Sequence, residues 1–235
     1  MKITDSVALV TGANRGLGKQ FARLLLERGA RKVFATARTP ESIDIPGVEA
    51  LRLDITDPAS VASVASAATD VDLLINNAGV ATYTNLVTGD LDQIRLELDT
   101  HFYGTLAMIR AFAPVLATNG GGAIVNVLSA MSWFSYDGAN AYSVAKAAEW
   151  SLTNGVRLEL AKQKTLVTGV HLGAADTEMM AGYEGPKLDP AEVVRAALDG
   201  VEAGKLEVVV DEWSANIKAA LSRDPHEFYG SSLMA

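Results

Sequence analysis

Short runs of β-branched and other apolar residues alternate along this chain with segments whose apolar residues recur at helical spacing. The apolar runs predict strands at Val7–Val10, Val33–Thr36, Glu49–Leu53, Asp72–Ile75, Ala123–Leu128, Leu166–His171 and Glu207–Val210. The helical patterns lie between them, at Gly16–Arg28, Pro58–Ala68, Leu91–Thr118, Ala141–Lys162 and Pro190–Ala203. Short apolar strands separated by helices are typical of a parallel sheet that is covered on both faces. We therefore expect an α/β fold with a doubly wound, seven-stranded parallel sheet.

The order of strands and helices is not interrupted by a repeat, a low-complexity tract or a linker, so we expect one domain over residues 1–235. After the sixth predicted strand comes a long segment with glycines, a proline and apolar side chains. In an open sheet such a segment suits a lid over the ligand crevice, here at about residues 173–190. Trp213 and Ile217 begin an apolar stripe at helical spacing, which predicts a C-terminal helix and tail over residues 212–235. This stripe needs a surface to cover, on its own domain or on a partner subunit.

Composition narrows the functions that the fold can serve. A formal net charge of −8 argues against a nucleic-acid surface and leaves no basic patch for anionic lipid. The chain has no cysteine, which excludes disulfides, thiol catalysis and thiolate metal sites. The histidines do not have the spacing of metal ligands, so we expect no metal. They are His101, His171 and His226.

Two charged residues bear on location. Asp5 stands where a signal peptide needs positive charge followed by an apolar run. Arg110 interrupts the long apolar stretch around residues 102–117, which is therefore not a membrane span. We expect a soluble cytoplasmic protein.

The first predicted strand runs into TGANRGLG, residues 11–18, which opens a helix. Gly12, Gly16 and Gly18 let the backbone turn tightly and approach a ligand, because no Cβ is in the way. The N-terminus of the following helix offers unpaired N–H groups and positive dipole to a pyrophosphate. Glycines in one loop can also be mere turn chemistry, but a loop between the first strand and the first helix favours a dinucleotide site.

The second predicted strand ends without the carboxylate that usually holds a ribose 2′-hydroxyl. No Asp or Glu occurs between Ala30 and Pro40; Arg38 stands there instead, and Arg15 lies inside the glycine loop. Two guanidinium groups without a competing carboxylate suit a 2′-phosphate, which favours NADP(H) as the cofactor. The alternative is a pair of solvated surface arginines.

Tyr142 and Lys146 are four residues apart on a helix otherwise rich in small side chains, so they project from the same face. A free tyrosine has a pKa of about 10, too high for rapid proton exchange near neutrality. A neighbouring ammonium favours the phenolate, although lowering the pKa by roughly three units requires about 4 kcal/mol of differential interaction. Alone, such a pair is usually a surface feature of a helix.

Taken together, five segments in this order resemble the short-chain dehydrogenase/reductase family of the single-domain, NADP(H)-dependent type. They are TGANRGLG (11–18), LDITD (53–57), NNAG (76–79), IVNVLS (124–129) and YSVAK (142–146). The resemblance covers nearly the whole chain, and Ser129 stands thirteen residues before Tyr142, as in the family. It implies a Rossmann-like fold.

The resemblance also implies the chemistry of the site. Tyr142 is the general acid that protonates a carbonyl oxygen as hydride arrives, and the base in reverse. Ser129 donates a hydrogen bond to the same oxygen, and Lys146 binds the nicotinamide ribose while it tunes Tyr142. The cofactor-binding residues are expected to be Gly12, Asn14, Arg15, Gly16, Leu17, Gly18, Arg38, Asp54, Ile55, Asn77, Ala78, Gly79, Tyr142, Lys146 and Thr177.

The chain departs from the family in two places. Leu172 replaces the proline of a Pro-Gly pair, which affects chain stiffness more than chemistry. His101 stands where the family has the Asn of a proton relay, so it is a further candidate catalytic residue. If its ring takes the place of that Asn, protonation should slow ketone reduction below about pH 6.5. Alternatively, its ring packs toward a partner subunit and only its backbone carbonyl serves the relay.

The substrate is expected to be a small carbonyl compound or alcohol, most of it apolar. Aromatic and methionine side chains follow Ser129 and occupy the predicted lid, and the candidates for substrate binding are Ser129, Trp133, Met180 and Tyr183. Alternatively, Trp133, Met180 and Tyr183 only pack within the core and the loops. Alternatives to carbonyl reduction are reduction of an imine or a conjugated system, or an NADP(H)-binding sensor without turnover. By resemblance, the chain forms a homodimer or homotetramer through its two long helices.

Overall fold

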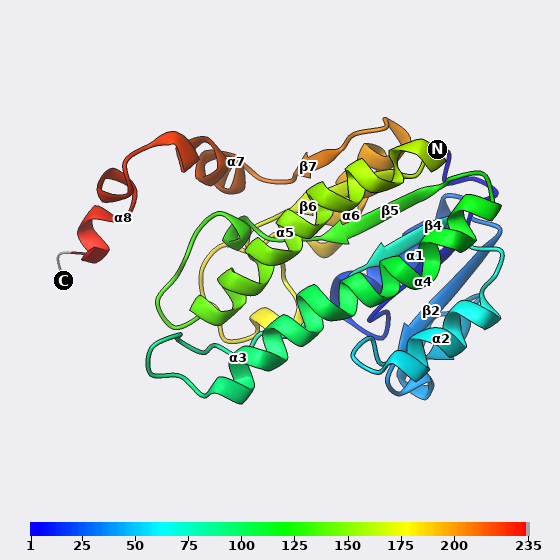
Figure 1. Ribbon diagram of the computed structural model, residues 1–235, viewed down its shortest axis with the longest axis horizontal. Helices are drawn as coiled ribbons and strands as arrows, with labels where there is room; N and C mark the ends of the chain where they lie inside the picture. Colours follow the sequence, from blue (N-terminus) through cyan, green and yellow to red (C-terminus); the bar gives the residue numbers. More distant parts are fainter. Residues whose placement is uncertain (234–235) are drawn as a thin grey trace.

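The seven strands of the computed structural model, which describes residues 1–233, form one parallel sheet with the order β3-β2-β1-β4-β5-β6-β7 (Figure 1). The strands are β1 (Val7–Val10), β2 (Lys32–Ala37), β3 (Glu49–Arg52), β4 (Leu73–Asn76), β5 (Ala123–Val127), β6 (Leu166–His171) and β7 (Glu207–Val209). The chain moves outward from β1 to β3, returns to β4 beside β1, and then proceeds to β7. This reversal confirms the doubly wound sheet, and in such sheets ligands bind at the carboxyl ends of the strands beside the reversal.

Helices cover both faces of the sheet. They are α1 (Gly16–Glu27), α2 (Pro58–Ala67), α3 (Leu91–Leu98), α4 (Thr105–Thr118), α5 (Asn140–Leu160), α6 (Pro190–Glu202), α7 (Glu212–Ala219) and α8 (Pro225–Leu233). Alternate residues of a strand point to opposite faces. Ala8 and Val10 therefore pack in the core under α1 and α6, whereas Val7 and Leu9 pack in the core under α2, α4 and α5.

One predicted helix, Leu91–Thr118, is wrong as a single element. The structure divides it into α3, a π-helical turn at Asp99–Gly104, and α4. A π turn holds one more residue than an α turn, and such turns are frequent at functional sites. Here the wider turn buries the His101 side chain. It also brings Gly104 so close to Ile55 that a Cβ there would lie 2.8 Å from the Ile55 side chain.

The predicted lid returns to the body of the domain. Ala175 and Leu188 pair across the segment, and a short 3-10 turn at Glu178–Met180 lies between them. Beyond β7, α7 and α8 extend away from the sheet (Figure 1). Phe134 stacks on Tyr229 of α8, with ring centroids 5.6 Å apart, so part of the tail packs on its own chain. Residues 234–235 of the predicted tail lie outside the described residues.

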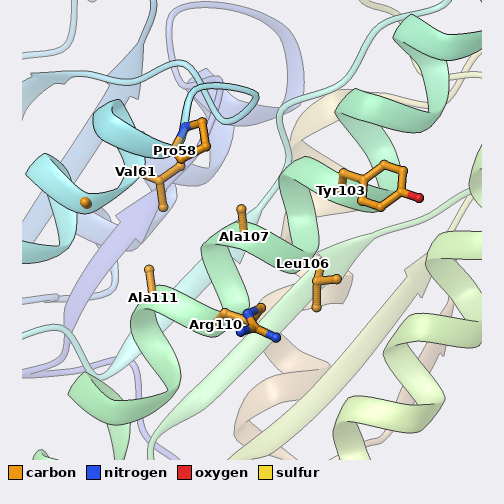
Figure 2. Close-up of a pocket in the computed structure, with 8 residues that line it drawn as sticks. Pro58, Val61, Tyr103, Leu106, Ala107, Arg110 and Ala111 are labelled. Atoms are coloured by element: carbon orange, nitrogen blue, oxygen red, sulfur yellow. The ribbon is translucent and has the colours of Figure 1, made fainter.

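A shallow groove of about 400 Å³ lies between α2 and α4 (Figure 2). Pro58 and Val61 of α2 lie on one side, and Ala107 and Ala111 of α4 on the other. None of the predicted site residues lines this groove. The predicted site residues lie instead beyond the carboxyl ends of the strands, as the glycine loop does after β1 and Ser129 after β5.

Of the helices within residues 1–233, none combines the length and the apolar character needed to cross a bilayer.

Candidate active site

The glycine loop joins the end of β1 to the start of α1. Gly12 and Gly16 adopt φ angles of +65° and +52°, which disfavour residues with a Cβ. Gly18 leaves no room for a side chain, because a Cβ there would lie 2.1 Å from the Gly12 carbonyl oxygen. Arg15, at the N-cap of α1, makes no capping hydrogen bond with its side chain, and the first turn of the helix has no acidic residue. The loop and the helix N-terminus thus fit a phosphate group.

The NNAG segment after β4 is fastened to this loop. The Asn77 side-chain amide donates to the carbonyl oxygens of Thr11 and Gly12, at 2.9 and 3.2 Å. The Thr11 hydroxyl in turn accepts from the backbone N–H groups of Asn77 and Ala78, both at 2.9 Å. The first motif thereby holds the third in place, and the predicted cofactor residues of both lie at one edge of the sheet.

The lid reaches the same loop. A Cβ on Gly16 would lie 3.3 Å from the Thr177 side chain, which places this predicted cofactor residue beside the glycine loop. Tyr83 had no role in the sequence analysis, yet its hydroxyl donates to the Met179 carbonyl at 2.6 Å. Tyr83 is exposed and adopts a φ of +52°, an uncommon conformation for a residue with a side chain. It links the segment after β4 to the lid.

The two arginines proposed for a 2′-phosphate are exposed at the same edge. Arg38 directly follows β2, and Asp54 follows β3, the neighbouring strand. Hydrogen bonds from Thr56 lower the pKa of the Asp54 carboxyl group, and the positive charge of Arg38 adds a smaller contribution in the same direction. Arg38 and Asp54 thus lie at the carboxyl ends of neighbouring strands, on the β3 side of the sheet.

Ser129, Tyr142 and Lys146 meet beyond the end of β5. Ser129 follows the strand, while Tyr142 and Lys146 stand one turn apart on α5. The Lys146 ammonium nitrogen is 5.7 Å from the centre of the Tyr142 ring. It donates to the Val127 carbonyl oxygen at 2.8 Å, and its side chain is 6% exposed. The strand end thereby fixes the position of the lysine relative to the tyrosine.

The electrostatics of Tyr142 differ from the expectation. Burial raises the pKa of its phenol above 10, and this effect outweighs the opposite effect of the Lys146 charge. The carboxylates of Glu149 and Glu97 raise the pKa further, whereas Ser129 lowers it slightly as a hydrogen-bond partner. The sequence predicted a net decrease because it revealed the lysine but neither the burial nor the two carboxylates.

His101 is buried within its own chain. Its ring meets the Tyr142 ring edge to face, with centroids 5.2 Å apart, and its Nε2 lies 2.8 Å from the Val80 carbonyl oxygen. A Cβ on Gly79 would lie 2.7 Å from the His101 ring. The ring therefore faces the tyrosine and the NNAG loop, not a surface that a partner subunit would cover.

Two buried glutamates were missed by the sequence analysis. Glu149 Oε2 accepts from Lys146 Nζ at 2.7 Å and lies 3.8 Å from His101 Nδ1. Glu97 Oε2 lies 3.3 Å from His101 Nε2, and its Oε1 accepts from the Thr82 backbone N–H. Glutamates in helices are usually exposed, so nothing marked these two. Their only signal is spacing, since Glu149 follows Lys146 by three residues and Glu97 precedes His101 by four.

The aromatic candidates for substrate binding have different surroundings. Trp133 is 8% exposed and stacks on His171 with ring centroids 3.9 Å apart, which leaves its indole little surface for a substrate. Met180 and Tyr183 belong to the lid, where Met180 is partly buried and Tyr183 is exposed. Within residues 1–233, no group of three or more His, Asp or Glu side chains is arranged to hold a metal ion.

A doubly wound parallel sheet with a glycine loop at the first helix defines a class of nucleotide-binding α/β proteins. Within that class, the sequence matches the short chain dehydrogenase family over residues 6–186. The chain therefore belongs to this family of oxidoreductases.

Individual relatives agree with this assignment. An uncharacterized oxidoreductase of Staphylococcus aureus strain MW2 is 29% identical over 209 residues, which cover 83% of this chain and 90% of the relative. The crystal structure of a short chain dehydrogenase from Burkholderia cenocepacia, in complex with NADP, is 40% identical, with a TM-score of 0.94 and 98% of each chain covered. A short-chain dehydrogenase from Sphingobium yanoikuyae in complex with NADPH is 27% identical, with a TM-score of 0.82 over 97% of this chain and 94% of that one.

Proposed function

We propose that this protein reduces a ketone or aldehyde to an alcohol with NADPH, reversibly, with Tyr142 as the general acid and base. The observation that carries the proposal is the buried arrangement beyond β5. Lys146 is hydrogen-bonded to the Val127 carbonyl there and lies below the Tyr142 ring, beside Ser129. Such an arrangement provides a proton donor held beside a fixed positive charge.

The cofactor assignment is supported by three independent features. The glycine loop and the N-terminus of α1 have the form of a phosphate site. Arg15 and Arg38 are exposed at the edge where a 2′-phosphate would lie, and no carboxylate ends β2. The similar structures from Burkholderia and Sphingobium contain NADP and NADPH. We infer that Arg15 and Arg38 hold the 2′-phosphate, that Asp54 and Ile55 contact the adenine, and that Thr177 contacts the nicotinamide end.

NADPH, when bound, supplies a hydride to the carbonyl carbon. The chain supplies the proton: Tyr142 transfers its phenolic proton to the carbonyl oxygen as negative charge develops there. Near neutral pH the phenol is protonated, as the direction of reduction requires. Ser129 donates a hydrogen bond to the same oxygen, and Lys146 stabilises the phenolate that remains. General acid catalysis of this kind contributes about 10²–10⁴-fold to the rate.

The substrate would enter between Tyr142 and the lid. Met180 and Tyr183 offer apolar surface on the lid side, and Tyr83 fastens the lid through Met179. This supports a small substrate with a mostly apolar body.

We also propose that two or four copies associate through α4 and α5. A groove of about 420 Å³ on the outer face of these helices includes Leu106, Leu152 and Gly155. A Cβ on Gly155 would meet nothing within 4 Å, which leaves room for another helix. Light scattering should give two or four times the chain mass of 24.8 kDa, and Gly155→Arg should reduce it. A wild-type monomer would contradict this.

Turnover tests the proposed function. Purified protein is mixed with NADPH and a panel of small apolar ketones and aldehydes, and the loss of absorbance at 340 nm is followed. Oxidation of NADPH with formation of the alcohol is expected. A parallel panel of cyclic imines and conjugated enones tests the other reductions. Tight NADPH binding without turnover of any panel would contradict the proposal and indicate a sensor.

A further inference from the structure

Lys146 has a buried counter-charge that its position in the active site does not require. Its ammonium group has three N–H donors. One bonds to Val127 O at 2.8 Å and another to Glu149 Oε2 at 2.7 Å, which leaves one donor for a ligand. Glu149 is 2% exposed, and its other oxygen accepts from the Thr105 hydroxyl at 3.2 Å. The carboxylate is thus held on both sides and cannot turn to solvent.

A buried ammonium without such a partner would act strongly on its surroundings. In a low dielectric, charges a few ångströms apart interact much more strongly than in water. An uncompensated Lys146 would therefore favour the Tyr142 phenolate, so that Tyr142 would lose the proton that reduction needs at a lower pH. Glu149 opposes this effect, because it places a negative charge on the same ammonium.

Other titratable groups also face Tyr142. On α5 these are Lys146 and Glu149, on the π-helical turn His101, and on α3 Glu97, whose carboxylate lies beside the His101 ring. Burial raises the pKa of Tyr142, and Glu149 and Glu97 raise it further against the effect of Lys146. Burial works to lower the pKa of Lys146 itself, but Glu149 reverses this and raises it.

We propose that Glu149 is a positioning residue that keeps Tyr142 protonated: it holds the Lys146 ammonium at the end of β5 and compensates its charge. Glu149 does not touch the reacting atoms and acts only through Lys146. The proposal rests on the proposed function in one respect, that Tyr142 is the acid of the reduction. It adds that the active site is set for the protonated tyrosine by a carboxylate on the same helix, one turn beyond the lysine.

The test compares Glu149→Gln with Glu27→Gln. Glutamine keeps an oxygen that can accept from Lys146, so the first substitution removes the charge and not the hydrogen bond. Glu27 is exposed at the end of α1, on the opposite face of the sheet, and receives the same substitution as a control. The protonation of Tyr142 is read without cofactor or substrate, from the ¹³Cζ resonance of labelled tyrosine during a pH titration. Tyr142→Phe identifies the resonance.

In Glu149→Gln, Tyr142 should deprotonate at lower pH than in the wild type, with roughly a tenfold higher ratio of phenolate to phenol at a fixed pH. Glu27→Gln should match the wild type. The basic limb of the pH–rate profile for reduction should move in the same direction. Titration of Tyr142 at the wild-type pH in Glu149→Gln would overturn the proposal, whether or not the enzyme reduces the ketones tested.

Two further variants keep the test decisive. Repeating the comparison in a His101→Asn background prevents a change in the charge of the imidazole from masking the effect. Glu149→Asp keeps the negative charge but places it farther from Lys146. Tyr142 in this variant should therefore deprotonate at a pH between those found in the wild type and in Glu149→Gln. If Glu149→Gln fails to fold, Glu149→Asp and Glu97→Gln carry the test, and wild-type titration in both would overturn the proposal.

Discussion

The rings of His101 and Tyr142 meet edge to face with centroids 5.2 Å apart, and both lie among buried charges. The resemblance places a relay Asn at this position, and here the imidazole of His101 lies beside the proposed acid. The π-helical turn Asp99–Gly104 directs it there. The position of this ring, and the carboxylates of Glu97 and Glu149 around it, decide what pH dependence to expect.

The first prediction concerns that pH dependence. The sequence alone predicts an acid limb near pH 6.5 that disappears in His101→Asn. The structure predicts otherwise, because burial and the nearby carboxylates raise the pKa of Tyr142, so the phenol stays protonated in this range whatever the charge on His101. The pH–rate profiles of ketone reduction at saturating NADPH should therefore superimpose below pH 7 for the wild type and His101→Asn. An acid limb present only in the wild type would restore His101 as a titrating relay residue.

The second prediction concerns cofactor choice. Arg38→Ala should lower kcat/KM with NADPH by roughly tenfold or more and leave kcat/KM with NADH nearly unchanged, because a charge-assisted bond to phosphate is worth about 1.5–3 kcal/mol. Arg31→Ala is the matched control, since Arg31 is exposed at the opposite end of β2. Equal use of NADPH and NADH by the wild type would refute the assignment.

The third prediction concerns stability in acid. His171 is fully buried, its Nδ1 faces the Ser129 carbonyl, and Trp133 stacks on its ring. Burial lowers the pKa of His171 to about 4. In the unfolded chain His171 binds a proton below about pH 6.5, whereas in the folded protein it does so only below about pH 4. The contribution of the neutral imidazole to the free energy of unfolding is therefore fully present above pH 6.5. It is lost as the pH falls through this window, by roughly 3 kcal/mol.

Urea unfolding at pH 7.5 and pH 5 measures this effect. The free energy of unfolding should fall less between the two pH values in His171→Gln than in the wild type. His226→Gln serves as the control, because His226 is exposed. An equal loss in the wild type and in His171→Gln would mean that the imidazole does not control the acid lability.

The fourth prediction concerns the lid. Tyr83→Phe removes the hydrogen bond to the Met179 carbonyl, which is worth about 0.5–1.5 kcal/mol. The closed lid should become less favourable, so KM for the carbonyl substrate should rise by about two- to tenfold while the Kd for NADPH stays the same. Tyr103→Phe is the control, since this exposed tyrosine lines the groove between α2 and α4. An unchanged KM in Tyr83→Phe would show that the bond does not hold the lid.

The five central strands, β2, β1, β4, β5 and β6, were predictable because their apolar runs are buried on both faces of the sheet, whereas the edge strands β3 and β7 are more exposed. The bounds of β1 and β6 were predicted to the residue, and those of the other strands within one residue at either end. The π-helical turn was not predictable, because one extra residue in a turn leaves the apolar pattern of Leu91–Thr118 almost unchanged. The packing of Trp133 on His171 was also hidden, because Trp133 follows a short 3-10 turn after β5, whereas His171 ends β6, 38 positions later.

The parts of the site in which a motif requires a particular backbone conformation were predictable from the sequence. The parts in which the burial of a side chain determines its role were not. Gly12 and Gly16 need left-handed angles, which the spacing of glycines reveals. No sequence pattern identifies Glu97 and Glu149 as site residues, because a glutamate in a helix is usually exposed to solvent and only the fold shows that these two are buried. Burial of Tyr142 reverses the expected shift in its pKa, and the two carboxylate charges add to this effect. The position of the tyrosine was therefore predictable from the sequence, but its electrostatics were not.

The rate of NADPH oxidation by Tyr142→Phe, with the best ketone of the panel, tests directly whether Tyr142 is the general acid. The phenyl ring preserves the packing against His101 and removes only the hydroxyl that donates the proton. If Tyr142 is the general acid, kcat should fall by about 10²–10⁴-fold, while the Kd for NADPH, measured by fluorescence titration, should stay within about twofold of the wild type. Retention of more than roughly a tenth of the wild-type kcat would contradict the role of Tyr142 as the general acid.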